Sequence, residues 1–137
     1  MRVPALVRVI VHGTAFLAGV AAGGLGSFVQ GYLWHGLPVG LLVALALSVA
    51  VFSAAGLMLG ARSGALAATA GWLLAVLYLS LRRPEGDLVV PASTLGYCWL
   101  FGGTLLAGAA IAVPSALWAA AGNRSGGQPS GSAPSGR

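Results

Sequence analysis

Long apolar segments without a charged residue alternate with short polar loops along this chain. Four such segments run from about residue 9 to 29, 38 to 59, 65 to 81 and 95 to 118. A transmembrane helix needs about 20 apolar residues, because each residue rises about 1.5 Å and the hydrocarbon layer is about 30 Å thick. The pattern therefore predicts an all-α fold, a transmembrane four-helix bundle, in which residues 1–121 form one four-span domain.

The connections between the apolar segments are too short to hold a soluble domain. They cover residues 31–37, 60–64 and 82–94. From residue 122 to 137 the chain changes to Gly, Ser, Pro and a few polar residues, a composition that cannot bury enough apolar surface to fold. We predict that this last segment is a disordered cytoplasmic tail.

The N-terminal segment also has features of a signal peptide. Arg2 and Arg8 precede the apolar stretch, and Val20-Ala21-Ala22 resembles a cleavage site with small residues. The apolar stretch continues through Phe28, however, which is longer than the usual hydrophobic region of a signal peptide. We therefore expect an uncleaved first span.

Composition supports a membrane protein and argues against nucleic-acid binding. Of 137 residues, 58% are hydrophobic and 7% are charged, whereas soluble domains carry about 25% charged residues. A net charge of +5 and a pI near 10.8 often indicate a nucleic-acid partner. Here the arginines are scattered between the apolar segments and form no basic patch, so no nucleic-acid partner is expected.

The arginines predict how the chain is oriented. Positive residues favour the cytoplasmic side of a membrane. With four spans, the side that holds both termini carries Arg2, Arg8, Arg62, Arg124 and Arg137, and the other side carries Arg82 and Arg83. We expect a multi-pass protein of the cell membrane with both termini cytoplasmic. Aromatic residues gather toward the proposed outer ends of the spans: Tyr32, Trp34, Tyr78, Tyr97 and Trp99.

Few residues are suited to catalysis or metal binding. Pumps and many ion carriers keep an ionisable group at membrane depth, but the four apolar segments contain no Asp, Glu, Lys or Arg. His12 lies at the inner end, whereas His35 and Cys98 lie toward the outer end, so the three cannot share a metal ion. We predict a protein that is not an enzyme, with no cofactor and no metal. His12 itself is either a proton acceptor, a lipid-phosphate contact or an ordinary interfacial residue.

The outer aromatic residues suggest a contact site for a lipid or another ligand. Its candidate residues are Tyr32, Trp34, His35, Arg82, Arg83, Tyr97 and Trp99. The aromatic side chains would line a groove, and the two arginines would meet a phosphate. The alternative is plain anchoring at the interface, where Tyr, Trp and Arg are common for physical reasons of their own.

Small residues at four-residue spacing predict close helix packing. The candidate helix-packing residues are Gly19, Gly23, Ser27, Gly71 and Gly108. Their spacing does not decide whether they pack within one chain or between chains. Two hypotheses for function follow. The first is a non-enzymatic membrane protein that packs with itself or with a larger membrane complex. The second is a small transporter or lipid-handling subunit with the outer aromatic groove.

Two short stretches carry a resemblance to a known group of proteins. Gly86-Asp87-Leu88-Val89-Val90-Pro91, followed by Gly96-Tyr97-Cys98-Trp99-Leu100-Phe101-Gly102-Gly103, resembles small uncharacterised four-helix membrane proteins of actinobacteria. The resemblance implies a bacterial inner-membrane protein with four helices and a domain of unknown function. It implies no activity, ligand or catalytic residue.

Overall fold

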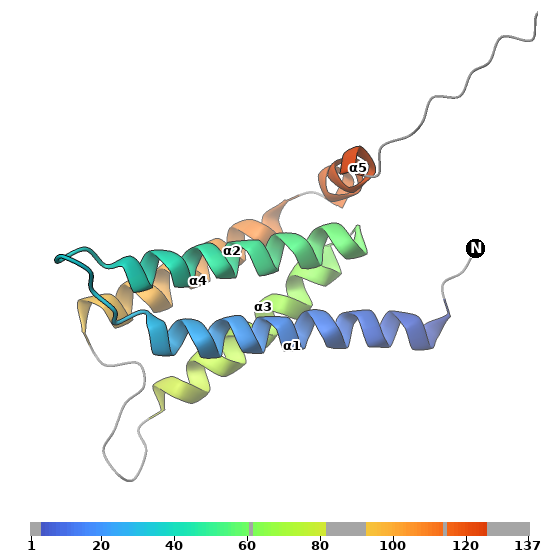
Figure 1. Ribbon diagram of the computed structural model, residues 1–137. Coiled ribbons are helices and arrows are strands. Elements are labelled where there is room, and N and C mark those ends of the chain that lie inside the picture. The colour runs from blue at the N-terminus through green and yellow to red at the C-terminus, as the bar shows by residue number, and fades with distance from the viewer. Residues whose placement is uncertain (1–3, 61, 82–92, 114, 126–137) are drawn as a thin grey trace, which may run out of the picture.

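The part of the chain that the structure describes consists mainly of helices joined by short connections. The computed structural model describes residues 4–60, 62–81, 93–113 and 115–125. Its helices are α1 (Ala5–Val29), α2 (Val39–Leu59), α3 (Arg62–Ser80), α4 (Thr94–Ala112) and α5 (Ser115–Ser125) (Figure 1). Helices α1 to α4 are each long and apolar enough to cross a membrane. The predicted all-α fold with four candidate spans is therefore confirmed.

Local sequence explains where several of these helices begin and end. Pro4 and Pro38 directly precede α1 and α2, where the missing N–H of proline removes no helical hydrogen bond. Gly60 ends α2 in the left-handed conformation, with φ of 57°, which glycine adopts without steric strain. Ser93 caps α4, because its hydroxyl oxygen accepts a hydrogen bond from the Gly96 N–H at 3.2 Å.

The fourth span is shorter than the sequence predicted. Helix α4 ends at Ala112, and the expected extension to Trp118 is wrong. Val113 has φ of −59° and ψ of 125°, an extended conformation. Because a residue before proline is disfavoured in the helical region, Pro114 explains this break.

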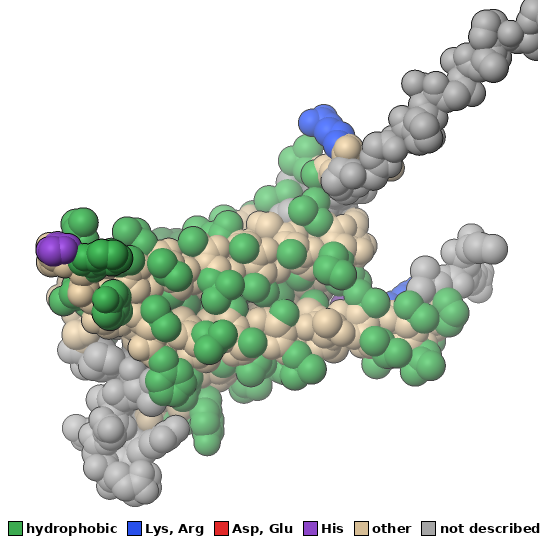
Figure 2. All heavy atoms as spheres, viewed as in Figure 1, with side chains coloured by type: hydrophobic (Ala, Val, Ile, Leu, Met, Phe, Trp, Pro, Cys, Tyr) green, Lys and Arg blue, Asp and Glu red, His purple; other side chains and the backbone are tan. Residues whose placement is uncertain are grey.

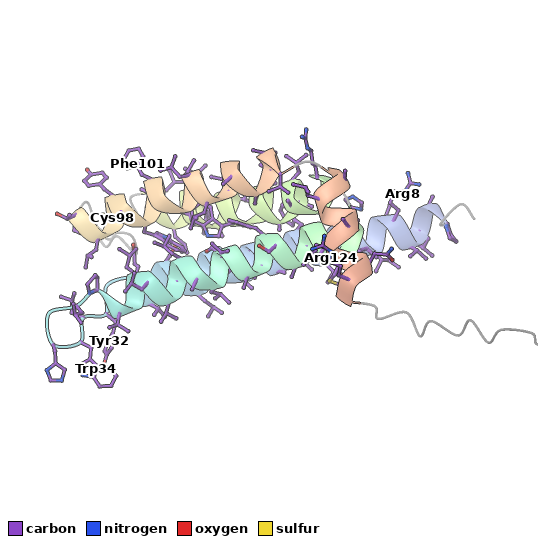
Figure 3. The ribbon with its side chains drawn as sticks, turned by 90° about the horizontal axis from the view of Figure 1, so that it is seen from above. Arg8, Tyr32, Trp34, Cys98, Phe101 and Arg124 are labelled. Atoms are coloured by element: carbon purple, nitrogen blue, oxygen red, sulfur yellow. The ribbon has the colours of Figure 1, made fainter. Side chains whose placement is uncertain are left out.

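Helix α5 follows the break and differs from the other four. It lies across the direction of the bundle, near the end where α1 begins (Figures 1 and 3). It packs against α2. The segment 122–125, which the sequence assigned to a disordered tail, forms its last turn, and residues 126–137 lie outside the described residues.

Helices α1, α2 and α3 pack on one another, and α4 joins them at one side. Helices α1 and α3 share the most extensive interface, and α2 packs against both (Figure 1). Helix α4 packs on α2 and α3, and among the described residues its other side is exposed. Figure 2 shows hydrophobic side chains spread over the whole visible face of the bundle. In water such a surface favours association, whereas lipid solvates it.

An aromatic core joins three of the helices. It consists of Phe52 on α2, Trp72 on α3 and Trp99 on α4, and all three side chains are fully buried. The Trp72 ring lies 6.2 Å from the Phe52 ring at 79°, and 5.1 Å from the Trp99 ring at 63°. These edge-on arrangements are favourable for aromatic rings. The centre of the bundle is thus filled by large side chains.

Candidate functional site

The two ends of the bundle carry different side chains. At one end, here called the arginine end, lie Arg8 at the start of α1 and Arg124 on α5 (Figure 3). At the opposite end, here called the aromatic end, lie Tyr32 and Trp34 in the α1–α2 connection and Cys98 near the start of α4 (Figure 3). The predicted separation of arginines and aromatic residues therefore holds for these labelled residues.

A tight turn shapes the aromatic end. The backbone N–H groups of Trp34 and Leu37 each donate to the other residue's carbonyl, at 3.0 and 2.9 Å. Between them, His35 has φ of 50° and Gly36 has φ of 81°. Positive φ at both central residues is typical of a type I′ turn. The exposed His35 ring stacks beside that of Trp34, with ring centres 6.0 Å apart. His35 is therefore the tip of a turn, pointing away from the bundle.

The expectation that Trp99 lines an outer groove is wrong. Its side chain is fully buried, and its indole N–H donates to the Ser27 hydroxyl at 3.2 Å. Tyr97, two residues earlier, is 52% exposed. Two residues turn a helix by about 200°, so Tyr97 and Trp99 cannot face the same side of α4.

The remaining candidates for the outer groove do not converge. Tyr32 and Trp34 lie on one side of the aromatic end, and Cys98, the neighbour of Tyr97, lies on the other (Figure 3). Arg82 and Arg83 lie outside the described residues. Tyr32 and Trp34 are each more than half exposed, as expected for side chains at a membrane interface.

Serine hydroxyls satisfy the buried tryptophan N–H groups. The Trp72 indole N–H donates to the Ser48 hydroxyl at 3.0 Å. Ser48 in turn donates to the Ala44 carbonyl at 3.0 Å, and Ser27 donates to the Gly23 carbonyl at 2.7 Å. Each serine thus links an indole to its own helix, and these polar atoms are paired without water. The sequence analysis missed Ser48, although a tryptophan in the middle of a span indicates the need for an acceptor.

Glycines hold α1 and α3 close together. A Cβ atom at Gly19 would overlap the backbone carbonyl of Ala68, and one at Gly71 would overlap the carbonyl of Phe16. At Gly23 a Cβ atom would lie 2.8 Å from the Trp72 carbonyl oxygen. Since these contacts are with backbone atoms, no side-chain rotation relieves them. Gly19 and Gly23 of α1 therefore face α3 of the same chain.

Gly108 differs from the other candidate helix-packing residues. It is exposed on α4, and a Cβ atom built there would meet no atom within 4 Å. The exposed side of α4, here called the α4 outer face, consists of Tyr97, Cys98, Phe101, Thr104, Leu105, Gly108 and Ala112. The Thr104 hydroxyl donates to the Leu100 carbonyl at 2.6 Å, so its polar atom is already paired. This face is uncovered within the described chain.

A groove lies at the arginine end between α1, α2 and the start of α3. It has a volume of about 480 Å³ and is lined by Val7, Arg8, Val11, His12, Met58, Leu59 and Ser63. His12 is held in place because its Nδ1 atom donates to the Arg8 carbonyl at 2.8 Å, which leaves Nε2 free. Arg62 points to α4 instead, and its Nε–H donates to the Val113 carbonyl at 3.3 Å. The groove therefore combines a free guanidinium, an imidazole and a hydroxyl.

Together these features define a class of protein. The described residues form an α-helical bundle in which four helices are long and apolar enough to cross a membrane, with a filled aromatic core and side chains of different chemistry at its two ends. The chain belongs to a family of unknown function, DUF6113, whose model matches residues 1–133. No curated protein and no solved structure is detectably similar to it.

Proposed function

We propose that this protein is a non-enzymatic, multi-pass protein of the bacterial cell membrane that associates laterally with a second copy of itself or with a larger membrane complex. Its interior supports this proposal. The buried tryptophan N–H groups are paired with serines, and most other buried side chains are alanine and larger apolar residues. Gln30 and Thr69 are the other buried polar side chains of the described residues, and their polar atoms have no partner there. Among the described residues, no three His, Cys, Asp or Glu side chains cluster as metal ligands would.

The α4 outer face is the observation that carries the proposal. In lipid, two helices gain little from burying apolar surface, and they associate where small residues let their backbones approach. Thr104, Gly108 and Ala112 repeat at four-residue spacing on this exposed face. The space around Gly108 is open. A second helix therefore has room for small-xxx-small packing on α4, whereas the corresponding positions of α1 face α3.

The only cysteine of the chain provides a direct test. Cys98 lies on the α4 outer face, so two copies that meet through α4 bring their Cys98 side chains to the same depth. We expect oxidation or a short bis-maleimide to link the full-length protein into a dimer in native membranes. Gly108→Leu should reduce the linked fraction about fivefold, since close helix contacts in membranes contribute about 1 kcal/mol.

The matched control is Ala46→Leu, which adds a leucine to the exposed side of α2. It should leave the linked fraction unchanged. A product with a mass other than twice that of the chain would identify a membrane partner of another kind. Equal linking in the native protein, Gly108→Leu and Ala46→Leu would argue against association through the α4 outer face.

The orientation that we propose places both termini in the cytoplasm. The positions of Arg8 and Arg124 at one end of the bundle support it, and Arg62 adjoins the end of α4 there. Reporters of compartment fused to the C-terminus and inserted in the segment 82–92 should give opposite signals, with the C-terminal reporter active only in the cytoplasm. Signals from the same side of the membrane would contradict four spans.

A small transporter or lipid-handling subunit is the alternative function. The structure gives little support to its outer aromatic groove. Trp99 is buried, and Tyr32 lies across the aromatic end from Cys98, the neighbour of Tyr97. A transport path also needs an opening through the core, whereas the aromatic core is filled by Phe52, Trp72 and Trp99. An interaction with lipid has better support at the arginine end.

A further inference from the structure

The groove at the arginine end continues into an apolar slot between α1 and α2. The slot has a volume of about 200 Å³ and is lined by Val11, Thr14, Ala15, Ala18, Val51, Ala54, Ala55, Met58 and Leu59. Val11, Met58 and Leu59 line both the groove and the slot. The two hollows are therefore neighbours, and together they lead from the end of the bundle toward its middle.

Small side chains create the slot. Four of its lining residues are alanines, two on each helix, so α1 and α2 leave a gap where larger side chains would meet. The only polar side chain of the slot is Thr14, and its hydroxyl donates to the Ile10 carbonyl at 2.9 Å. The slot thus offers no free hydrogen-bonding group, and a flexible hydrocarbon chain is the chemistry that it fits.

The groove, unlike the slot, is lined by several polar or charged side chains as well as apolar ones. Arg8 carries a charged guanidinium on an exposed side chain, and the fork of donors in guanidinium suits phosphate oxygens. The hydroxyl of Ser63 lines the same groove and is a donor that suits a phosphate oxygen. Ser63 also belongs to the first turn of α3, and the dipole of a helix favours an anion near its N-terminus.

Charges elsewhere in the described chain do not oppose this preference. The described residues include no Asp or Glu. Arg62 and Arg124 lie at the same end of the bundle but outside the groove. Arg8 is therefore the cation that a negatively charged ligand would meet in the groove.

We propose that this site binds an anionic phospholipid from the surrounding leaflet. Its phosphate lies at Arg8 and Ser63, and one acyl chain fills the slot beside Ala18 and Ala54. A soluble phosphate would leave the slot unused, and a neutral lipid would not use the cation. The site lies at the end opposite to Tyr32 and Trp34, and it does not depend on association through α4.

The test compares two lipids that share the same acyl chains. The full-length protein is delipidated in detergent and mixed with phosphatidylglycerol or phosphatidylcholine. Native mass spectrometry then measures how many lipid molecules remain bound to each protein. We expect one phosphatidylglycerol to be retained preferentially. Arg8→Gln should reduce its affinity by about tenfold, because a charge-assisted hydrogen bond to phosphate is lost. Arg124→Gln removes a cation at the same end but outside the groove, and it should keep the preference.

A second pair of variants tests the slot. Ala54→Leu fills the slot and should abolish preferential retention of phosphatidylglycerol, whereas Ala46→Leu makes the same change on the same helix outside the slot and should retain it. Circular dichroism of all variants establishes that they are equally helical. Retention unaffected by Arg8→Gln or by Ala54→Leu would overturn the proposal. Displacement of the lipid by millimolar inorganic phosphate would also overturn it, because it would indicate a site for a soluble anion.

Discussion

Replacing Trp72 with alanine is expected to lower the free energy of unfolding by about 3–5 kcal/mol, the usual range for a buried aromatic side chain. The Trp72 ring is fully buried and contacts Phe52 and Trp99 edge-on. Its removal leaves a cavity between α2, α3 and α4, and the Ser48 hydroxyl loses its indole partner. Because three helices meet at this ring, the surrounding backbone cannot readily collapse into the space.

Unfolding of the purified chain in mild detergent, titrated with SDS and followed by circular dichroism, measures this effect. Trp34→Ala is the matched control. It removes the same side chain from a position that is 59% exposed, where a substitution changes stability by less than about 0.5 kcal/mol. Equal unfolding midpoints for Trp72→Ala and Trp34→Ala would contradict a packed aromatic core.

A single methyl group at position 19 is expected to cause the second largest loss. In Gly19→Ala the new Cβ atom overlaps the Ala68 carbonyl, which belongs to the backbone of α3. The two helices must move apart, and overpacking of this kind costs about 1–3 kcal/mol. The same SDS titration should show an earlier unfolding midpoint.

Gly13→Ala provides a control on the same helix, and it is expected to leave stability unchanged or to raise it. A Cβ atom at Gly13 meets nothing within 4 Å. Because alanine favours helix over glycine by about 1 kcal/mol, this variant should unfold at the same or a higher SDS concentration. A loss of stability in Gly13→Ala equal to that in Gly19→Ala would mean that the Ala68 contact is not what disfavours a side chain at position 19.

The number and approximate positions of the candidate spans could be predicted from the sequence, because they depend only on segment length and apolar composition. The four candidate spans follow from segments too long and too apolar for a soluble domain. Sequence reasoning failed at the end of α4, because the apolar segment continues past Pro114 while the helix stops at Ala112. The restriction that proline places on the preceding Val113 was the signal that could have located this end.

Candidate site residues were harder to predict than spans. Tyr97 and Trp99 look equivalent as aromatic residues near a span end, yet one is exposed and the other fully buried. Gly19 and Gly108 are both glycines with small residues four positions away, yet Gly19 contacts α3 and Gly108 is open. The groove at Arg8 and its slot were not predicted, because their residues come from three helices whose arrangement the sequence does not reveal.

The sequence by itself determined that the chain has four apolar segments of membrane-spanning length and that these segments carry no charged side chain. It also determined that five of the seven arginines flank the segment ends on the side that would hold both termini. Only the tertiary structure decided which side of each helix is buried. In a soluble helix the apolar stripe marks the buried side. A helix in lipid is apolar all round, so hydrophobicity carries no such information, and close packing of glycines, serines and tryptophans selects the partner instead.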